Sequence, residues 1–189
     1  MLARRVVVWE LGVALIVACA LVFLLSRRLR DLSAAYQELR RLSTLPHAGT
    51  VVPTFRTLTL VGDSITVGEL PDSAARQVLF VFNTTCSFCR GIIPLWEQLA
   101  DSIGGLGRRV QALAISLDPL DTTRHYAAEH ALRYPVLTFP QRKPERLYRA
   151  AVVPQTLVLD GTGTVLYAKT GTLDSSSLDS VYSAVLGPR

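Results

Sequence analysis

One run of apolar residues limits what this chain can fold into. Residues 6–25 form a stretch of twenty residues in which Glu10 is the only charge. A helix of that length measures about 30 Å, which is the thickness of the hydrocarbon core of a membrane. The run predicts one transmembrane helix at 6–25, preceded by a short tail at 1–5. Because it is longer than the apolar part of most cleaved signal peptides, we expect an uncleaved signal anchor.

Cys19 lies inside this run, in a segment Ile16 to Cys19 that is similar to the lipidation box of bacterial lipoproteins. The lipidated cysteine of such a box normally begins a polar linker, whereas residues 20–25 are apolar. We therefore expect Cys19 to be a small apolar residue in lipid, with lipidation as the open alternative.

Charge is concentrated beside the run and does not point to a nucleic-acid partner. Residues 1–46 carry seven arginines against three acidic residues, whereas residues 47–189 carry almost equal numbers of each sign. A phosphate-binding surface needs a basic patch on the folded domain, so we expect no nucleic-acid binding. Two arginines precede the run and five follow it within 26–46, which by the positive-inside rule would place the C-terminal part in the cytoplasm.

The chain after the run divides into a stalk and one domain. Apolar residues recur at steps of three and four from Leu29 to Leu42, which predicts an amphipathic helical stalk at 26–46. This stripe is too short to predict an oligomeric state. Pro46 ends the stalk, and residues 47–53 are interpreted as a linker. Residues 47–189 suffice for one ordinary domain.

The domain alternates strand and helix patterns, which predicts a mixed sheet with helices on both faces. The predicted elements are a hairpin at 57–67, strands at 78–82 and 110–115, helices at 88–103 and 121–132, a short helix at 144–151, a second hairpin at 156–168 and a last helix at 175–186.

Cys86 and Cys89 lie where the predicted strand at 78–82 gives way to a helix. The start of a helix favours an anion, so we expect Cys86 to ionise near neutral pH. Two intervening residues place the second sulfur one helical turn along, within disulfide distance of the first. The pair therefore predicts a redox-active disulfide, in which Cys86 attacks a partner and Cys89 resolves the mixed disulfide.

The surroundings of this pair resemble a thioredoxin-like fold, and more closely the membrane-anchored TlpA/ResA-type thiol-disulfide oxidoreductases of bacteria. The resemblance covers 47–189 and rests on a strand followed by T-T-C-S-F-C-R at 84–90, on Pro94, and on V-V-P-Q-T at 152–156. It implies a thioredoxin-like mixed sheet flanked by helices, with an N-terminal β-hairpin extension. It also implies that Pro94 kinks the active-site helix, that Pro154 is a cis-proline beside the disulfide, and that the backbone of Val153 pairs with a substrate peptide. The residues flanking the motif are Thr85, Ser87, Phe88 and Arg90.

Four positions depart from the pattern of the family. Thr85 and Phe88 stand where a Trp and a Pro are common, Phe80 replaces the buried acid of thioredoxin, and Ile92 replaces a Glu of some ResA-type proteins. No carboxylate is left for the proton of the resolving cysteine, so water or a residue that the sequence does not identify must take it. The pair Ser87-Phe88 leaves the direction of electron flow open, and we expect a reductase.

Other functions are less well supported. The two cysteines with His125 and His130 could suggest zinc, but histidines five residues apart point away from each other on a helix, so we expect no metal. The P-x-x-x-T-x-x-C signature of peroxiredoxins would need Pro and Thr where Leu79 and Asn83 stand, and a copper chaperone of related fold would need Cys-x3-Cys. The remaining alternative is a non-catalytic, tethered thioredoxin-like module that binds proteins.

The resemblance also implies partners and a location. It implies no cofactor beyond the redox-active disulfide Cys86–Cys89, and it implies protein thiol and disulfide substrates, with apocytochrome c as one candidate. A reductase would need a membrane electron donor. The chain would be a single-pass protein of the cell membrane with an extracytoplasmic (periplasmic) C-terminal domain. The arginine count disagrees, and we follow the resemblance because such domains usually work outside the reducing cytosol.

Overall fold

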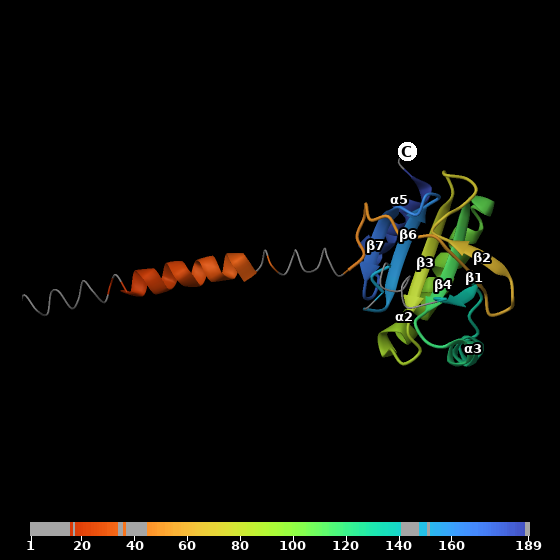
Figure 1. Cartoon of the computed structure of the whole chain (residues 1–189), viewed down its shortest axis with the longest axis horizontal. Coiled ribbons are helices and arrows are strands. Elements are labelled where there is room, and N and C mark those ends of the chain that lie inside the picture. Colours follow the sequence, from red (N-terminus) through yellow and green to blue (C-terminus); the bar gives the residue numbers. More distant parts are fainter. Residues whose placement is uncertain are drawn as a thin grey trace, which may run out of the picture. The chain divides into compact units, whose positions relative to one another are not determined.

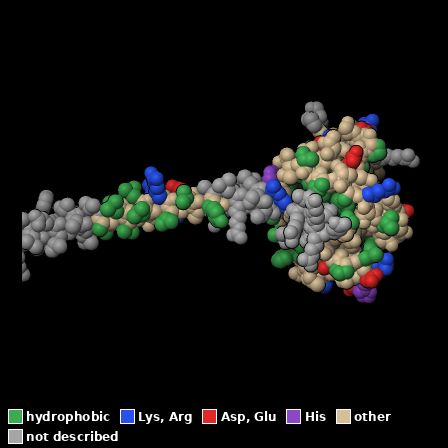
Figure 2. Space-filling view, in the orientation of Figure 1, with side chains coloured by type: hydrophobic (Ala, Val, Ile, Leu, Met, Phe, Trp, Pro, Cys, Tyr) green, Lys and Arg blue, Asp and Glu red, His purple; other side chains and the backbone are tan. Residues whose placement is uncertain are grey.

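The computed structural model describes residues 16, 18–33, 36, 45–140, 148–150 and 152–187. The chain divides into two compact units, Met1–Ser43 and Thr44–Arg189. In the first unit residues 18–33 are helical. Leu21 to Leu25 each expose more than half of their surface, and Figure 2 shows hydrophobic side chains along this helix.

The predicted membrane segment lies largely outside the described residues, because residues 6–15 and 17 belong to the part that the structure does not describe. The same holds for residues 34–35 and 37–44 of the predicted stalk. Of the helices in the described ranges, none combines the length and the apolar character needed to cross a membrane.

The second unit is built on a five-stranded mixed sheet, as the sequence predicts (Figure 1). Its strands follow the spatial order β5-β4-β3-β6-β7. The three strands β3, β4 and β5 run parallel to one another. The strand β6 runs antiparallel to both of its neighbours, β3 and β7. Their bounds are β3 Arg76–Phe82, β4 Val110–Ser116, β5 Val136–Thr138, β6 Gln155–Asp160 and β7 Val165–Thr170.

The described helices α2 (Ser87–Gly104), α3 (Leu120–Glu129) and α5 (Ser175–Leu186) contribute buried side chains to one core, formed with Val78, Phe80 and Phe82 of β3. The alternate β3 residues Leu79 and Val81 belong to a second core. This alternation follows from the strand period of two, which points successive side chains to opposite faces. A short 3-10 helix, η1 (Gly107–Arg109), precedes β4.

The second core is covered by elements other than the described helices. It includes Phe55 and Val67 from a hairpin of β1 (Phe55–Leu58) and β2 (Ser64–Val67), and Tyr148. Helices on both faces of the sheet, as predicted, are therefore not found among the described residues. The short helix predicted at 144–151 falls mostly outside them, and residues 148–150 form a turn.

The structure corrects two further predictions. Residues 47–53 are not a free linker, because the Gly49 N–H donates to the Val165 carbonyl at 2.8 Å and Val52 is buried. The strand β5 was not expected at all. The hairpin predicted at 57–67 is present as β1–β2, and it forms a sheet of its own. One bridge joins the hairpin region to β5, between Thr59 and Leu137.

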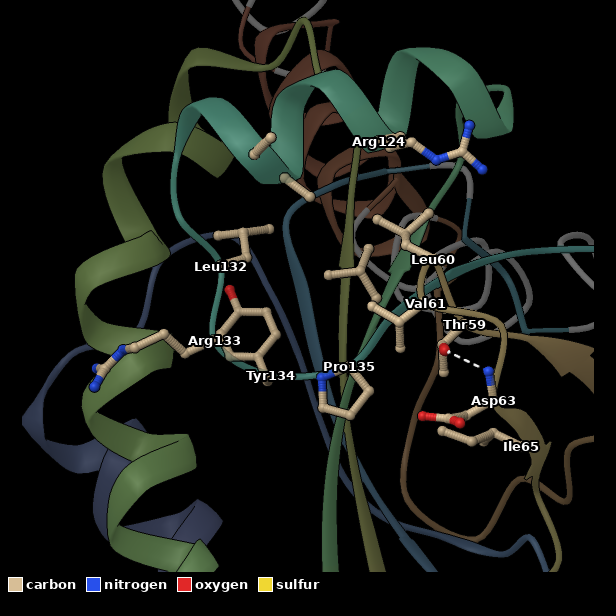
Figure 3. A pocket seen from close by; sticks show the side chains of 13 residues that line it. Thr59, Leu60, Val61, Asp63, Ile65, Arg124, Leu132, Arg133, Tyr134 and Pro135 are labelled. Atoms are coloured by element: carbon tan, nitrogen blue, oxygen red, sulfur yellow. Dashed lines mark hydrogen bonds between the residues drawn. The ribbon is translucent and has the colours of Figure 1, made fainter.

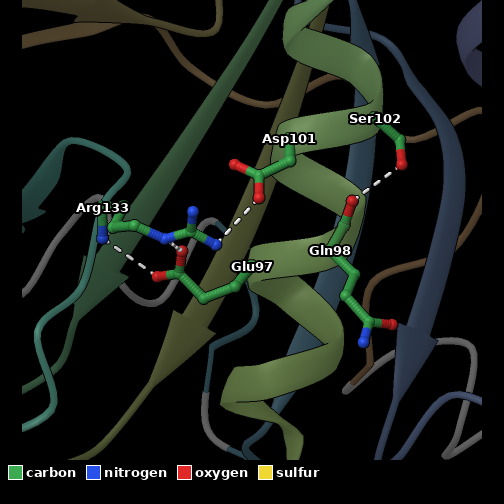
Figure 4. A network of polar contacts seen from close by, with 5 residues as sticks. All are labelled: Glu97, Gln98, Asp101, Ser102 and Arg133. Carbon is green, nitrogen blue, oxygen red and sulfur yellow. Dashed lines mark hydrogen bonds and ion pairs between the residues drawn. The ribbon is translucent and has the colours of Figure 1, made fainter.

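A cluster of ion pairs ties the middle of α2 to the segment before β5 (Figure 4). The Arg133 guanidinium donates to Glu97 at 2.7 Å and to Asp101 at 2.8 Å. The Arg133 amide also donates to Glu97, at 2.9 Å. These contacts join the solvent side of α2 to the segment before β5.

The sheet topology brings three segments to one edge. β3 ends at Phe82 beside Ser116, the last residue of β4, and the antiparallel β6 begins at Gln155 beside Val81. The residues that follow β3 and β4, and those that precede β6, are therefore neighbours. These are the segments 83–89, 117–119 and 152–154.

Candidate functional site

Cys86 lies at the start of α2, where it is the N-cap residue. Its sulfur accepts a hydrogen bond from the Cys89 amide at 3.2 Å, and its own amide donates to the Asn83 carbonyl at 3.2 Å. The residue is half-buried. The Cys89 amide and the start of the α2 helix dipole therefore point at the Cys86 sulfur.

Cys89 has the opposite environment, since it is fully buried in the core that contains Phe82. Burial raises the pKa of the Cys89 thiol to about 12, helped by its contact with the Cys86 sulfur and by the negative charge of Asp118. Both cysteines are free thiols in this structure. Cys86 is therefore partly exposed, whereas Cys89 is shielded from solvent.

The segment before β6 supplies the third side of the site. The peptide bond between Val153 and Pro154 is cis, the conformation that the resemblance implies. The Cys86 thiol points to the Val153 carbonyl at 3.9 Å, which brings the predicted substrate-binding backbone next to the predicted nucleophile. Pro154 is buried, and its carbonyl accepts the Gly171 amide at 2.8 Å.

The residues that flank the motif are mostly exposed. Thr85, Ser87 and Arg90 have exposed surfaces, and the Thr85 amide donates to the Asn83 side chain at 2.8 Å. Phe88 exposes 68% of its surface, an unusual degree for a large apolar side chain. The predicted Pro94 lies inside α2. It is exposed, at more than one turn from the cysteines.

Asp118 is a carboxylate that sequence reasoning did not find. It follows β4, and its Oδ2 accepts the Thr84 amide at 2.6 Å while Oδ1 accepts the Asn83 side-chain amide at 3.3 Å. These bonds hold it against the loop that carries Cys86, and its charge raises the Cys89 pKa. The sequence offers only a partial signal, the position of Asp118 three residues after the predicted strand 110–115, since parallel strands end at the same edge.

Tyr126 was also missed, although it lies in the core beneath the site. The residue is 5% exposed on α3, and its ring stacks on Phe82 with 5.5 Å between centroids. Burial raises the pKa of Tyr126, and charge on Cys89 raises it further. The position of Tyr126 in its helix pattern predicts only a buried aromatic side chain. The sequence therefore does not indicate that Tyr126 lies near the site.

The predicted site does not coincide with the pocket drawn in Figure 3. That pocket measures about 460 Å³ and lies between the hairpin turn, α3 and the segment before β5. Leu60, Val61, Leu132 and Tyr134 make its wall largely apolar (Figure 3). None of the predicted site residues lines it. Both cysteines therefore lie outside this pocket.

His125 and His130 do not join the cysteines in a metal site within the described ranges, where no group of three or more His, Cys, Asp or Glu side chains could hold a metal ion. His130 instead packs its ring against Tyr126, with 4.3 Å between centroids. His125 is exposed.

Comparison with known proteins gives a family and a fold. Residues 48–168 match the model of the AhpC/TSA family. No curated protein matches the chain at a significant level. Several solved structures are similar, and three are compared here in turn.

A thiol:disulfide interchange protein of the thioredoxin family from Chlorobium tepidum is 21% identical with a TM-score of 0.59, over 75% of this chain and 99% of that chain. StoA from Bacillus subtilis is 15% identical with a TM-score of 0.58, over 70% and 98%. The thioredoxin domain of a thiol-disulfide oxidoreductase from Bacteroides vulgatus is 14% identical with a TM-score of 0.60, over 74% and 99%. These likenesses confirm the predicted thioredoxin-like fold.

Proposed function

The chain belongs to the AhpC/TSA family, and from that membership and the geometry of its two cysteines we propose that it is a thiol-disulfide oxidoreductase acting on protein substrates. One observation carries the proposal. A half-buried cysteine at the start of a helix contacts a fully buried one, and the backbone of a cis-proline segment lies beside the first. This arrangement separates an attacking sulfur from a resolving sulfur.

The reaction follows from these two environments. The Cys86 thiolate attacks one sulfur of a client disulfide, forms a mixed disulfide and releases the other client sulfur as a thiolate. Cys89 then releases its proton to water, and its sulfur attacks the Cys86 sulfur. The Cys86–client bond breaks, and the second client sulfur leaves with the electron pair. The client gains two electrons, and the enzyme is left with a Cys86–Cys89 disulfide.

Val153 supports recognition of an extended client segment. Its carbonyl faces the Cys86 sulfur, and the segment lies at the start of β6 on the exposed side of the site. A client backbone that runs alongside would place its cysteine next to Cys86. The exposed Phe88, which lies between the two cysteines in sequence, and Val152, next to Val153, offer apolar surface to such a client.

We propose further that the chain is a membrane-anchored reductase, held by residues 6–25 with its domain on the extracytoplasmic side. The consecutive exposed apolar residues from Leu21 to Leu25 support an anchor, because such a surface is stable in lipid rather than in water. In that setting a membrane electron donor returns the Cys86–Cys89 disulfide to the thiol form. The clients are extracytoplasmic proteins that contain a disulfide, with apocytochrome c as a candidate.

Trapping of mixed disulfides tests this function. In full-length protein with Cys19→Ala, so that only two thiols remain, the Cys89→Ala variant should accumulate mixed disulfides with clients because resolution is blocked. The matched Cys86→Ala variant should accumulate none. Equal trapping by both variants would contradict the roles of the cysteines, and full activity of the double variant in cells would favour a binding module. Trapping of cytosolic proteins alone would contradict the extracytoplasmic location.

A further inference from the structure

The Asn83 side chain makes three hydrogen bonds in the loop that leads from β3 to Cys86. Its oxygen accepts the Thr85 amide at 2.8 Å and the Thr85 hydroxyl at 2.5 Å. Its amide group donates to Asp118 Oδ1 at 3.3 Å. The oxygen and the nitrogen can be told apart, because a backbone N–H only donates and an ionised carboxylate only accepts. Both ends of this side chain are therefore held.

Asp118 is itself held by the neighbouring strand and helix. It follows β4, and its amide donates at 3.1 Å to the hydroxyl of Ser116, the last residue of that strand. The Thr123 hydroxyl of α3 donates to the Asp118 carbonyl at 3.3 Å. The second carboxylate oxygen of Asp118 accepts the Thr84 amide at 2.6 Å. One carboxylate thus binds two successive residues of the loop, the side chain of Asn83 and the backbone of Thr84.

The backbone of Asn83 is also joined to the proposed nucleophile. Its carbonyl accepts the Cys86 amide at 3.2 Å, which closes the turn before α2. The Cys86 sulfur accepts the Cys89 amide at 3.2 Å and faces the Val153 carbonyl at 3.9 Å. The place of the sulfur between these two groups therefore depends on the conformation of residues 83–86.

We propose that Asn83, held by Asp118, is a positioning residue that keeps the Cys86 sulfur in its attacking place. The inference rests on the proposed function, since it concerns the first step of that reaction. The thiolate is the attacking species, and the Cys89 amide stabilises it only while the two groups stay aligned. In this step the Cys86 thiolate bonds to one client sulfur, and the other client sulfur leaves with the electron pair of the broken disulfide. Asn83 makes and breaks no covalent bond.

A small disulfide probe measures this step. Reduced full-length protein in detergent, with Cys19→Ala, is mixed with 5,5′-dithiobis(2-nitrobenzoate), and the released coloured thiolate is followed by stopped flow. The first equivalent reports attack by Cys86, and the second reports resolution by Cys89. The pH is chosen where the rate of the first phase still rises with pH. In Asn83→Ala we expect that phase to slow by about tenfold, the effect of weakening one charge-assisted hydrogen bond to the thiolate.

An exchange of the two side chains tests the hydrogen bonds themselves. In Asn83→Asp/Asp118→Asn, the carboxylate at position 83 can accept both Thr85 groups. The side-chain amide at position 118 then donates to this carboxylate, and its oxygen accepts the Thr84 amide. Every bond is kept and the charge of the pair is unchanged, so the first phase should stay within about threefold of the reference. Asn83→Ala/Asp118→Asn removes the charge without restoring the bonds and should stay slow; recovery in this variant would contradict the inference.

Asp160→Ala is the matched control for a general loss of stability. Asp160 accepts the Thr162 and Thr164 amides, each at 2.9 Å, in the turn between β6 and β7, at the end of β6 opposite to the cis-proline. Its first phase should match the reference. The inference is overturned if Asn83→Ala reacts like the reference or loses its near-ultraviolet circular dichroism, if the exchanged pair is as slow as Asn83→Ala, or if Asp160→Ala is slowed equally. Release of a single equivalent by the reference protein would instead overturn the proposed function.

Discussion

The carboxylate of Asp118 acts on the buried cysteine of the pair. Asp118 accepts the Thr84 amide at 2.6 Å and raises the pKa of the Cys89 thiol, so it helps to keep Cys89 protonated in the reduced protein. Asp118→Asn keeps an oxygen that can accept the Thr84 amide and removes the charge. We therefore expect the Cys89 pKa in the variant to fall below its value of about 12 in the parent.

The measurement is the pH titration of the ¹³Cβ shift of labelled Cys89 in the reduced protein. The control Asp121→Asn removes a charge from the first turn of α3, where Asp121 pairs with Arg124 at 3.1 Å and does not influence Cys89. That control should leave the titration unchanged. A Cys89 pKa that stays the same or rises in Asp118→Asn would show that the carboxylate does not act on the thiol through its charge.

The residues of the site differ in how far the sequence could predict them. Cys86 and Cys89 are visible because their spacing and their place after a buried strand are local features. Asp118 is thirty-four positions from Thr84, and its contact depends on the register of β3 beside β4, which no local pattern contains. The place of Tyr126 near the site is still harder to predict, because any buried aromatic residue of a helix has the same sequence pattern.

At the scale of elements, one hydrogen bond joins the active-site helix to the strand that carries the cis-proline segment. The Trp96 indole on α2 donates to the Thr156 hydroxyl on β6 at 3.0 Å, and both residues are at most 1% exposed. Thr156→Val keeps the shape of the side chain and leaves the indole N–H unpaired. We expect a loss of about 1–3 kcal/mol in the free energy of unfolding, measured by urea titration.

Thr57→Val is the matched control for this change, because Thr57 lies on the hairpin strand β1 and is only partly buried. Valine suits a strand, so the control should stay within about 0.5 kcal/mol of the parent. If Thr156→Val were as stable as Thr57→Val, the bond between α2 and β6 would have no net stabilising effect.

The long elements were predictable because their patterns are strong. The buried strand β3 and the helix α2 were expected within two residues of their observed ends. The strand β5 has three residues, Val136–Thr138, too few for a period to be recognised. The segment 49–52 has the composition of a linker, but its backbone pairs with Gly163 and Val165, a contact across more than a hundred residues. Short pieces of this kind take their structure from the sheet they join.

At the scale of the whole molecule, the boundary between the two units lies closer to the predicted membrane segment than the sequence indicates. The Leu45 carbonyl accepts a hydrogen bond from the Arg149 side chain at 3.1 Å, and Pro46 is buried. Residues assigned to the end of the stalk are therefore part of the folded domain, which divides from the rest between Ser43 and Thr44. A helix-breaking proline marked where the stalk pattern ends, but it did not show on which side of it the domain begins.

The buried thiol also sets how the stability of the reduced domain depends on pH. Cys89 has its ordinary pKa of 9.0 in the unfolded chain and about 12 in the folded one. Above pH 9 the unfolded chain therefore binds fewer protons than the folded chain, and the free energy of unfolding falls as pH rises. One such group contributes a slope of about 1.4 kcal/mol per pH unit. The buried Tyr134 and Tyr148, whose pKa values are also raised, add to the fall only above about pH 10.

We therefore expect the reduced protein with Cys19→Ala to lose stability between pH 9 and 10 more steeply than the same protein with Cys89→Ala added. The measurement is urea unfolding at intervals of half a pH unit, followed by near-ultraviolet circular dichroism. The Cys89→Ala variant is less stable at every pH because a buried side chain is shortened, so the slopes are compared rather than the values. Above pH 10 the tyrosines steepen both curves equally, and the difference in slope due to Cys89 persists up to its folded pKa of about 12. Equal slopes between pH 9 and 10 would mean that Cys89 ionises in the folded domain as readily as in the unfolded chain, and burial would then not be what separates it from Cys86.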